Sequence, residues 1–129
     1  MSGPVSDDLV ARAEAVAARA YAPYSRYKVG AVVRTTDGRE FEGVNVENAA
    51  YPLGVCAEKA ALVAAVAAGY EPGQIAAIGI NASPCGGCRQ WLHEFRVPEV
   101  SFRRADGSIA TYAADELLPD TWDCPGLAD

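Results

Sequence analysis

The stretch "CAEKAALVAAVAAG", Cys56 to Gly69, decides the fold. Its alanine, valine and leucine residues place apolar side chains on nearly every face of a helix, which is typical of a helix buried on all sides. Gly69 is the kind of residue at which helices commonly end. We therefore expect this helix to occupy a central position in the domain.

Upstream of this helix, two β-branched runs flank a polar turn. The runs "KVGAVVRT" (28–35) and "FEGVNV" (41–46) read as strands, and "TTDGRE" (35–40) between them contains the Asp-Gly pair common in hairpins. Before the hairpin, apolar residues recur at helical spacing. This pattern predicts a first helix, capped by Ser6 and running to about Ala20, that covers the sheet.

Downstream, the pattern predicts a strand, a helix, two short strands and a brief helix, in "QIAAIGIN" (74–81), "CRQWLHEF" (88–95), "EVSFRRADGSIATY" (99–112) and "ADELLP" (114–119). A strand-helix-strand crossover requires parallel pairing in part of the sheet. We therefore expect a single domain spanning residues 1–129, with an α/β fold: a three-layer α/β/α sandwich around a mixed central sheet.

Composition and charge narrow the function classes. The chain has 129 residues, 50% of them hydrophobic, enough for one sizeable core. Its formal net charge of -6 opposes nucleic-acid binding, which usually requires a basic face, and favours a small-molecule partner. No window is apolar enough to span a membrane, and Asp7 and Asp8 stand where a signal peptide would be basic. We expect a cytoplasmic protein.

The four cysteines suit metal binding or catalysis better than a disulfide framework in a cytosolic chain. Cys56, Cys85 and Cys88 each lie at the start of a predicted helix, whereas Cys124 belongs to a Pro/Gly-containing tail. We interpret Cys124 as a thiol without a role in the site.

A catalytic zinc ion needs three protein ligands, an open position for water and a group that moves protons. Cys85 and Cys88, three residues apart on one helical turn, can reach one ion together, and Cys56 can supply a third thiolate. The partial positive charge at two helix starts would favour ionised sulfurs. Glu58, two residues after Cys56, suits a proton shuttle better than a ligand.

Other interpretations of the same residues stay open. The pair in "PCGGC" (84–88) could be a redox dithiol, and Cys56 could be a small core residue of an alanine-rich helix. A structural zinc site would need a fourth Cys or His. His93, the only histidine, lies five residues after Cys88 on a different helical face, and we predict an exposed or half-buried helix residue.

Three blocks, considered together, resemble the signature of the cytidine deaminases, small homotetrameric zinc enzymes of nucleoside salvage. They are "NVENAAY" (45–51), "CAEKAAL" (56–62) and "PCGGCRQWL" (84–92), and the resemblance runs from about residue 21 to residue 122. It implies that Cys56, Cys85 and Cys88 hold one Zn²⁺ per subunit. It also implies that Glu58 activates the water that attacks C4 of the cytosine ring, with loss of ammonia and formation of uridine or deoxyuridine.

The resemblance also implies a substrate site. Asn45 and Glu47 match the pair that binds the sugar hydroxyl, chemistry suited to an amide and a carboxylate. Tyr27 occupies the place of an aromatic, commonly phenylalanine, that packs against the pyrimidine. The backbone of Ala57 lies where the family contacts the base, and Tyr51 matches a tyrosine near a site shared between subunits.

The remaining correspondences concern assembly and charge. Trp122 falls where relatives carry an aromatic that reaches a neighbouring subunit's pocket, although it could simply cover the core. Lys59 replaces the arginine that commonly donates to the thiolates, so Lys59 and Arg89 are the candidates for charge compensation. The segment before Pro84 is shorter than usual. These departures keep two alternatives: a deaminase of a nucleoside analogue such as blasticidin S, and a non-catalytic zinc-binding module.

Overall fold

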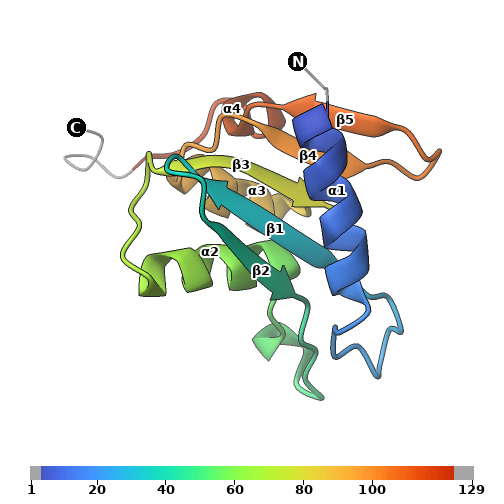
Figure 1. The fold of residues 1–129 in the computed structure, drawn as a ribbon. Coiled ribbons are helices and arrows are strands. Elements are labelled where there is room, and N and C mark those ends of the chain that lie inside the picture. The colour runs from blue at the N-terminus through green and yellow to red at the C-terminus, as the bar shows by residue number, and fades with distance from the viewer. Residues whose placement is uncertain (1–3, 124–129) are drawn as a thin grey trace.

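In the computed structural model, which describes residues 4–123, helices cover both faces of a mixed sheet (Figure 1). The strand order is β2-β1-β3-β4-β5. Strands β3 and β4 are parallel and are joined through α3, while the other neighbouring pairs are antiparallel. The elements are α1 (Pro4–Ala17), β1 (Gly30–Thr35), β2 (Glu40–Val44), the 3₁₀ helix η1 (Tyr51–Leu53), α2 (Ala57–Ala67), β3 (Ile75–Ile80), α3 (Gly86–Glu94), β4 (Val100–Arg103), β5 (Ile109–Tyr112) and α4 (Ala114–Leu117).

The alternation of side chains along β1 produces the two cores of the sandwich. Val32 packs with Leu9 and other residues of α1 on one face of the sheet. Ala31 and Val33 point to the opposite face and join the larger core beneath α2 and α3. Because successive residues of a strand face opposite sides, one largely buried strand contributes side chains to both cores. The predicted three-layer α/β/α architecture is confirmed.

Two glycines set how closely the helices approach the sheet. A Cβ atom on Gly43 in β2 would lie 2.4 Å from the backbone of both Ala57 and Ala61 in α2. A Cβ atom on Gly79 in β3 would lie 2.5 Å from the backbone of Leu9 in α1. The absence of a side chain at these positions therefore lets α2 and α1 pack directly on the sheet, one on each face.

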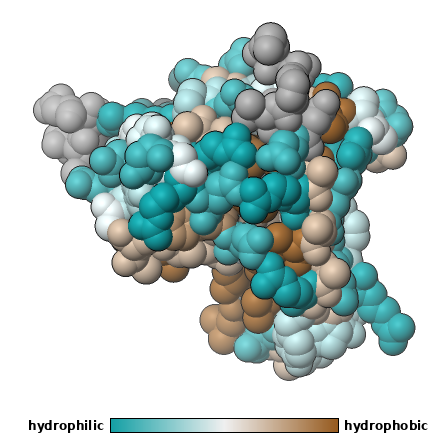
Figure 2. Space-filling model, viewed as in Figure 1, coloured by the Kyte–Doolittle hydropathy of each residue, from teal (hydrophilic) through white to brown (hydrophobic). Residues whose placement is uncertain are grey.

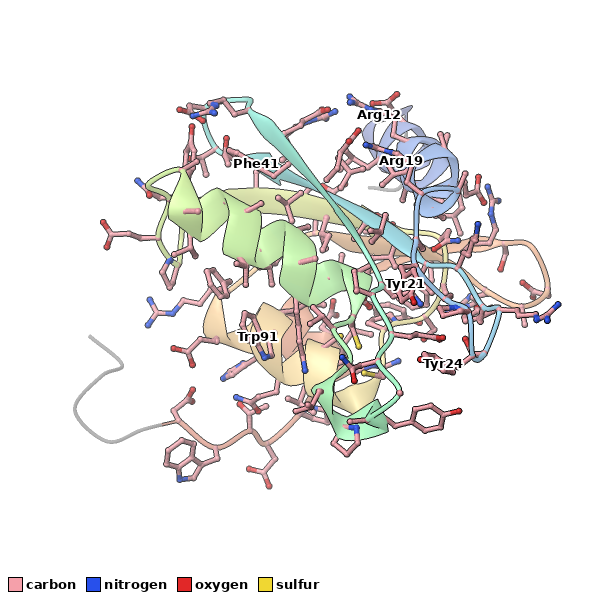
Figure 3. The ribbon with its side chains drawn as sticks, turned by 90° about the horizontal axis from the view of Figure 1, so that it is seen from below. Arg12, Arg19, Tyr21, Tyr24, Phe41 and Trp91 are labelled. Atoms are coloured by element: carbon pink, nitrogen blue, oxygen red, sulfur yellow. The ribbon has the colours of Figure 1, made fainter. Side chains whose placement is uncertain are left out.

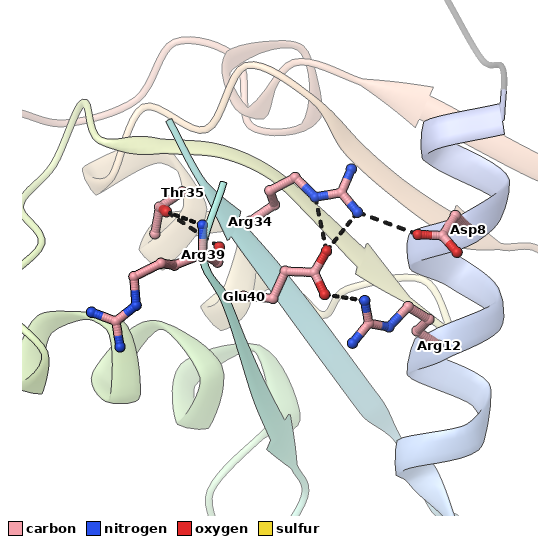
Figure 4. A network of polar contacts seen from close by, with 6 residues as sticks. All are labelled: Asp8, Arg12, Arg34, Thr35, Arg39 and Glu40. Atoms are coloured by element: carbon pink, nitrogen blue, oxygen red, sulfur yellow. Dashed lines mark hydrogen bonds and ion pairs between the residues drawn. The ribbon is translucent and has the colours of Figure 1, made fainter. Parts of the chain in front are cut away.

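Ion pairs fix α1 to the first hairpin (Figure 4). The guanidinium of Arg34 donates to Glu40 at 2.6 and 2.9 Å and to Asp8 at 3.2 Å, and Arg12 pairs with the other Glu40 oxygen. These side chains are partly exposed, so each pair adds little to the free energy of unfolding. Their shared carboxylate nevertheless ties the first helix to β1 and β2.

Two sequence predictions about helices are wrong. The first helix begins at Pro4, so Ser6 lies within the helix instead of capping it, and the helix ends at Ala17. Proline is favoured at a first helical position because its missing N–H has no helical partner there. The central helix is not buried on all sides in the single chain, because Val63 and Val66 are 52% and 48% exposed.

The end of α2 follows the sequence prediction closely. Gly69 has a φ of +106°, the amide of Gly69 donates to Val66, and the amide of Tyr70 donates to Ala65. These two bonds end the helix at a residue with left-handed backbone geometry, which glycine adopts at little cost.

Among the described residues, no helix is both long enough and apolar enough to cross a membrane.

Candidate active site

Two helices begin side by side at residues that carry thiols. Cys56 is the N-cap of α2 and Cys85 is the N-cap of α3, each with extended backbone geometry. The carbonyl of each cysteine accepts the first helical bond, from the amides of Ala60 and Arg89. Helix starts carry unpaired N–H groups and partial positive charge. The expectation that two helix starts frame the cysteine cluster is met.

The sulfur atoms of Cys56, Cys85 and Cys88 lie within 4.8 Å of one another. Cys88 is buried, Cys56 is partly exposed and Cys85 is exposed, so the cluster opens toward solvent on one side. Small movements bring three sulfurs at this spacing to the Zn–S distance of about 2.3 Å. Within residues 4–123, no fourth Cys or His joins the three thiols, which suits a zinc site that keeps one open position.

The three thiols differ in how readily they ionise. Burial and the nearby charge of Glu58 raise the pKa of Cys88, and burial also raises the pKa of Cys56. Burial acts in the same direction on Cys85, but the backbone N–H of Cys88 and hydrogen bonds with the other two thiols lower the Cys85 pKa overall. Binding of a divalent cation would favour the ionised form of all three.

Glu58 lies beside the thiols and is almost completely buried, with 4% of its surface exposed. Burial raises the pKa of its carboxyl group, against a hydrogen bond with Cys88 and the charge of Lys59. A carboxyl group whose pKa is raised in this way is better suited both to accept a proton and to return it. The structure therefore gives Glu58 the environment of a general acid and base.

Lys59 and Arg89, predicted to balance the thiolate charge, occupy different surroundings. The Lys59 ammonium lies 5.9 Å from the centre of the Trp91 ring on α3 (labelled in Figure 3). If Gly87 carried a Cβ atom, that atom would lie 3.9 Å from both Lys59 Nζ and Cys85 Sγ. The ammonium nitrogen and the sulfur are therefore no more than twice that distance apart. Arg89 instead donates to Pro84 O at 2.9 Å, Leu117 O at 3.2 Å and Ser83 Oγ at 3.2 Å.

A cavity of about 460 Å³ opens beside Glu58. The predicted site residues Tyr27, Cys56, Ala57, Glu58 and Cys85 line it. Its volume is in the range of small-molecule sites. The structure thus brings the Tyr27 side chain, Ala57, two thiols and the Glu58 carboxyl group to one cavity.

Sequence reasoning missed the other wall of this cavity. Residues 81–83, which follow β3, and residues 103–105, at the end of β4, complete the lining. The carboxyl ends of neighbouring parallel strands are the usual place for ligands in open α/β sheets. Asn81, a polar residue directly after a buried strand, was the available signal. Its amide oxygen accepts from Gly30 N at 3.0 Å and its nitrogen donates to Lys28 O at 3.2 Å.

Asn45 and Glu47, the predicted sugar-binding pair, both contact the loop that carries Tyr27. Asn45 accepts from Val29 N at 2.8 Å and donates to Tyr27 O at 2.9 Å. Glu47 accepts from the amides of Tyr24 and Ser25 at 3.0 and 3.1 Å. Hydrogen bonds from the Ser25 hydroxyl and these amides lower the pKa of the Glu47 carboxyl.

A second cavity, of about 250 Å³, is lined in part by this loop. Glu47 and Tyr51 line it together with Tyr24, labelled in Figure 3. Tyr51 is 73% exposed and meets Tyr24 edge to face, with ring centres 6.0 Å apart. Trp122 is 71% exposed and lines neither of these two cavities.

The two remaining sequence predictions concern His93 and Cys124. His93 is half-buried, as predicted, and its ring contacts Asp123 at 2.7 Å and Thr121 at 2.9 Å. It therefore fastens the segment after α4 to α3. Cys124 lies outside the described residues.

The α/β/α sandwich and the open cluster of thiols beside a buried carboxyl group define the class of metal-dependent enzymes that activate water. Residues 5–104 match the model of the family described as "Cytidine and deoxycytidylate deaminase zinc-binding region". The chain is 37% identical over 126 residues to a cytidine deaminase of Halalkalibacterium halodurans, covering 90% of this chain and 94% of that protein.

Solved structures agree with the family match. A cytidine deaminase from Burkholderia pseudomallei superposes with a TM-score of 0.84 at 45% identity, covering 90% of this chain and 98% of the other. One from Mycobacterium tuberculosis gives a TM-score of 0.79 at 35% identity, covering 92% and 97%. The chain therefore belongs to the family of cytidine and deoxycytidylate deaminases.

Proposed function

We propose that the protein catalyses the zinc-dependent hydrolytic deamination of cytidine and deoxycytidine to uridine and deoxyuridine, in pyrimidine salvage. The observation that carries this proposal is the buried Glu58 carboxyl group beside the clustered sulfurs of Cys56, Cys85 and Cys88, at the wall of one cavity. We further propose that residues 1–129 form one deaminase domain and that it acts in the cytoplasm.

The reaction adds water to C4 of the cytosine ring and removes the amino group as ammonia. Cys56, Cys85 and Cys88 would hold zinc, which lowers the pKa of a coordinated water when it is bound. Glu58 takes a proton from the attacking water and later delivers a proton to the leaving nitrogen. Its burial keeps competing water away and raises its proton affinity toward the value that both transfers need.

The other predicted binding residues hold the substrate in this proposal. Tyr27 packs against the pyrimidine ring, and the backbone of Ala57 contacts the base, since both line the cavity beside Glu58. Asn45 and Glu47 bind the sugar hydroxyl. Each keeps hydrogen-bonding capacity beyond the loop contacts that it makes, because an amide nitrogen has two hydrogens and a carboxylate has about four acceptor positions.

Lys59 is the side chain that balances the thiolate charge in this proposal. Its ammonium lies no farther from Cys85 Sγ than twice 3.9 Å and is near the Trp91 ring, whose face attracts a cation. Arg89 has a different position, since its guanidinium donates to two carbonyl groups and a hydroxyl. Arg89 therefore contributes positive charge from a distance while it fixes the segment before α3.

A homotetramer completes the proposal. The exposed Val63 and Val66 lie on α2, and Leu53 in η1 is also exposed. Figure 2 shows apolar surface along the lower part of the molecule, over α2 and η1. A second copy would cover this surface, because contiguous exposed apolar patches commonly mark an interface. Tyr51 and Trp122 would then contribute to a site or pocket of a neighbouring subunit.

An assay of the purified, metal-analysed protein tests the function. We expect about one zinc per chain and a loss of absorbance as cytidine or deoxycytidine is converted, with much slower conversion of blasticidin S. Faster conversion of blasticidin S would favour the nucleoside-analogue alternative. Bound zinc with no turnover of any of these compounds would leave the non-catalytic module as the function.

A further inference from the structure

Ser25 connects the loop of Tyr27 to the carboxylate of Glu47. Its hydroxyl donates to Glu47 Oε2, while its backbone amide donates to Glu47 Oε1 at 3.1 Å. The amide of Tyr24 donates to the same Oε1 at 3.0 Å. Both carboxylate oxygens are therefore held, Oε1 by the two amides and Oε2 by the hydroxyl of Ser25.

A second contact fixes the direction of the Ser25 hydroxyl. The amide of Tyr27 donates to Ser25 Oγ at 3.0 Å, across Arg26, which has a left-handed φ of 62°. Because this N–H occupies one acceptor position of the oxygen, the hydroxyl hydrogen is directed to Glu47. The loop therefore presents Ser25 to Glu47 as an oriented donor.

The position of Glu47 determines what this donor can do. Ser25 and Glu47 both line the cavity of about 250 Å³, so the carboxylate is accessible from it. An ionised carboxylate has about four acceptor positions, and the three loop donors leave at least one of them for a ligand hydroxyl. Without the Ser25 donor, Oε2 loses its fixed partner and the carboxylate, held only at Oε1 by the two amides, can rotate.

We propose that Ser25 is a positioning residue for substrate binding, which holds the Glu47 carboxylate in the orientation that accepts a hydrogen bond from the sugar of the nucleoside. This role rests on the proposed function, in which Glu47 binds the sugar hydroxyl. Ser25 itself acts through Glu47 and is not assigned a step in the chemistry. The role concerns substrate affinity and leaves proton transfer by Glu58 unchanged.

The test compares Ser25→Ala on two substrates, cytidine and 2′,3′-dideoxycytidine, which lacks the sugar hydroxyls that Glu47 would bind. We expect the KM for cytidine to rise about tenfold, the size typical of a lost hydrogen bond to a charged group, with kcat little changed. The KM for dideoxycytidine should stay within about twofold of the wild-type value. Ser25→Thr keeps the hydroxyl and should restore most of the affinity for cytidine.

Ser108→Ala is a matched control. Ser108 also donates to a carboxylate, with its hydroxyl at 2.6 Å and its amide at 2.9 Å from Asp106, in the turn between β4 and β5. The Ser108→Ala substitution removes the same hydroxyl group from a turn residue that lines neither cavity. Both KM values should remain unchanged in this variant.

The outcomes separate the two proposals. If Ser25→Ala raises both KM values equally, lowers kcat alone or changes neither, Ser25 does not position Glu47 and the inference is overturned. In a Glu47→Gln background, Ser25→Ala should have little further effect on cytidine, and additive losses would also overturn it. A wild-type protein that binds zinc but fails to convert cytidine would refute the proposed function, and with it this role.

Discussion

Glu58 is the side chain on which turnover depends most directly. We expect Glu58→Gln to fold and retain zinc, because an amide of the same shape fits beside Cys88 and the three cysteines are unchanged. Turnover should fall by at least about 100-fold, because an amide cannot exchange the proton at neutral pH. Cytidine conversion and zinc content measured on the same sample check this. A rate near that of the wild type would show that another group moves the proton.

Lys59 gives a prediction about metal retention. Replacing it with methionine removes the positive charge near Cys85 while keeping an apolar stem against Trp91, so zinc should pass to a chelator several-fold faster. Lys59→Arg should retain the metal. Lys28→Met, which removes a lysine that bonds to Ala18 O at 3.2 Å, is the control. If zinc leaves the wild-type protein and Lys59→Met at the same rate, a group other than Lys59 balances the charge of the thiolates.

The sequence indicated the centre of the site better than its walls. The spacing of Cys85 and Cys88, with Cys56 and Glu58 at a helix start, suggested a zinc site with a proton shuttle, and the resemblance of three sequence blocks to cytidine deaminases favoured it over a redox pair. Residues 103–105 were missed because they reach the cavity through the order of strands in the sheet, which no local pattern encodes, whereas Asn81 carried a local signal that was not used. The contacts of Glu47 with its loop were missed because they join residues 22 and 23 positions apart.

At the scale of elements, the distance between α2 and the sheet controls where Cys56 and Glu58 stand. We expect Gly43→Ala to decrease the free energy of unfolding by about 1–3 kcal/mol, because the new Cβ overlaps the α2 backbone. It should also weaken zinc binding, since α2 begins at the metal cluster. Chemical denaturation and chelator competition measure the two effects.

Gly79→Ala is the matched control for this prediction, because its Cβ meets α1 on the opposite face of the sheet. It should destabilise the fold to a similar extent while the folded protein keeps its zinc affinity. If both variants weaken zinc binding equally, the loss of zinc affinity results from general destabilisation of the fold and not from a shift of α2.

The turn of the first hairpin predicts a pH dependence. Hydrogen bonds from Thr35 Oγ1 at 2.5 Å and from the Tyr70 hydroxyl at 2.8 and 2.9 Å lower the pKa of Asp37. Because the pKa of Asp37 is lower in the folded state, ionised Asp37 stabilises the protein at pH values above the unfolded-state pKa of 3.8. This stabilisation is lost as the pH falls through the folded-state pKa. Tyr70→Phe should therefore lower Tm slightly at pH 7, and the difference should shrink below pH 3.8. A difference independent of pH would contradict this origin.

Strands and helices were predictable as elements because their periodicity and turn residues are local. The Asp-Gly turns, the C-terminal Gly69 and the crossover through α3 all follow from short stretches of sequence. The start of α1 was placed at Ser6 from a capping preference, but Pro4 is equally suited to a helix start and lies two residues earlier. The degree of burial of α2 depends on which surfaces meet, which composition alone does not determine.

At the scale of the whole molecule, the apolar face of α2 explains why the sequence predicted a helix buried on all sides. The single chain covers Ala57, Ala61 and Leu62 but leaves Val63 and Val66 about half exposed. Valine residues are usually among the most buried in proteins. Other copies of the chain in the proposed homotetramer would bury these valines. The apolar composition of α2 on all sides would then match its surroundings in the assembly.

Val63→Glu tests this assembly. A carboxylate on the α2 face would have to be buried unpaired between subunits, so the variant should sediment as smaller species while its far-UV circular dichroism stays unchanged. Activity should fall with assembly, because Tyr51 and Trp122 could no longer reach a neighbouring subunit. Ala11→Glu, on the exposed side of α1, should remain assembled and active. A fully assembled Val63→Glu protein would place the interface on another surface, whereas an active monomer would show that each chain carries a complete site.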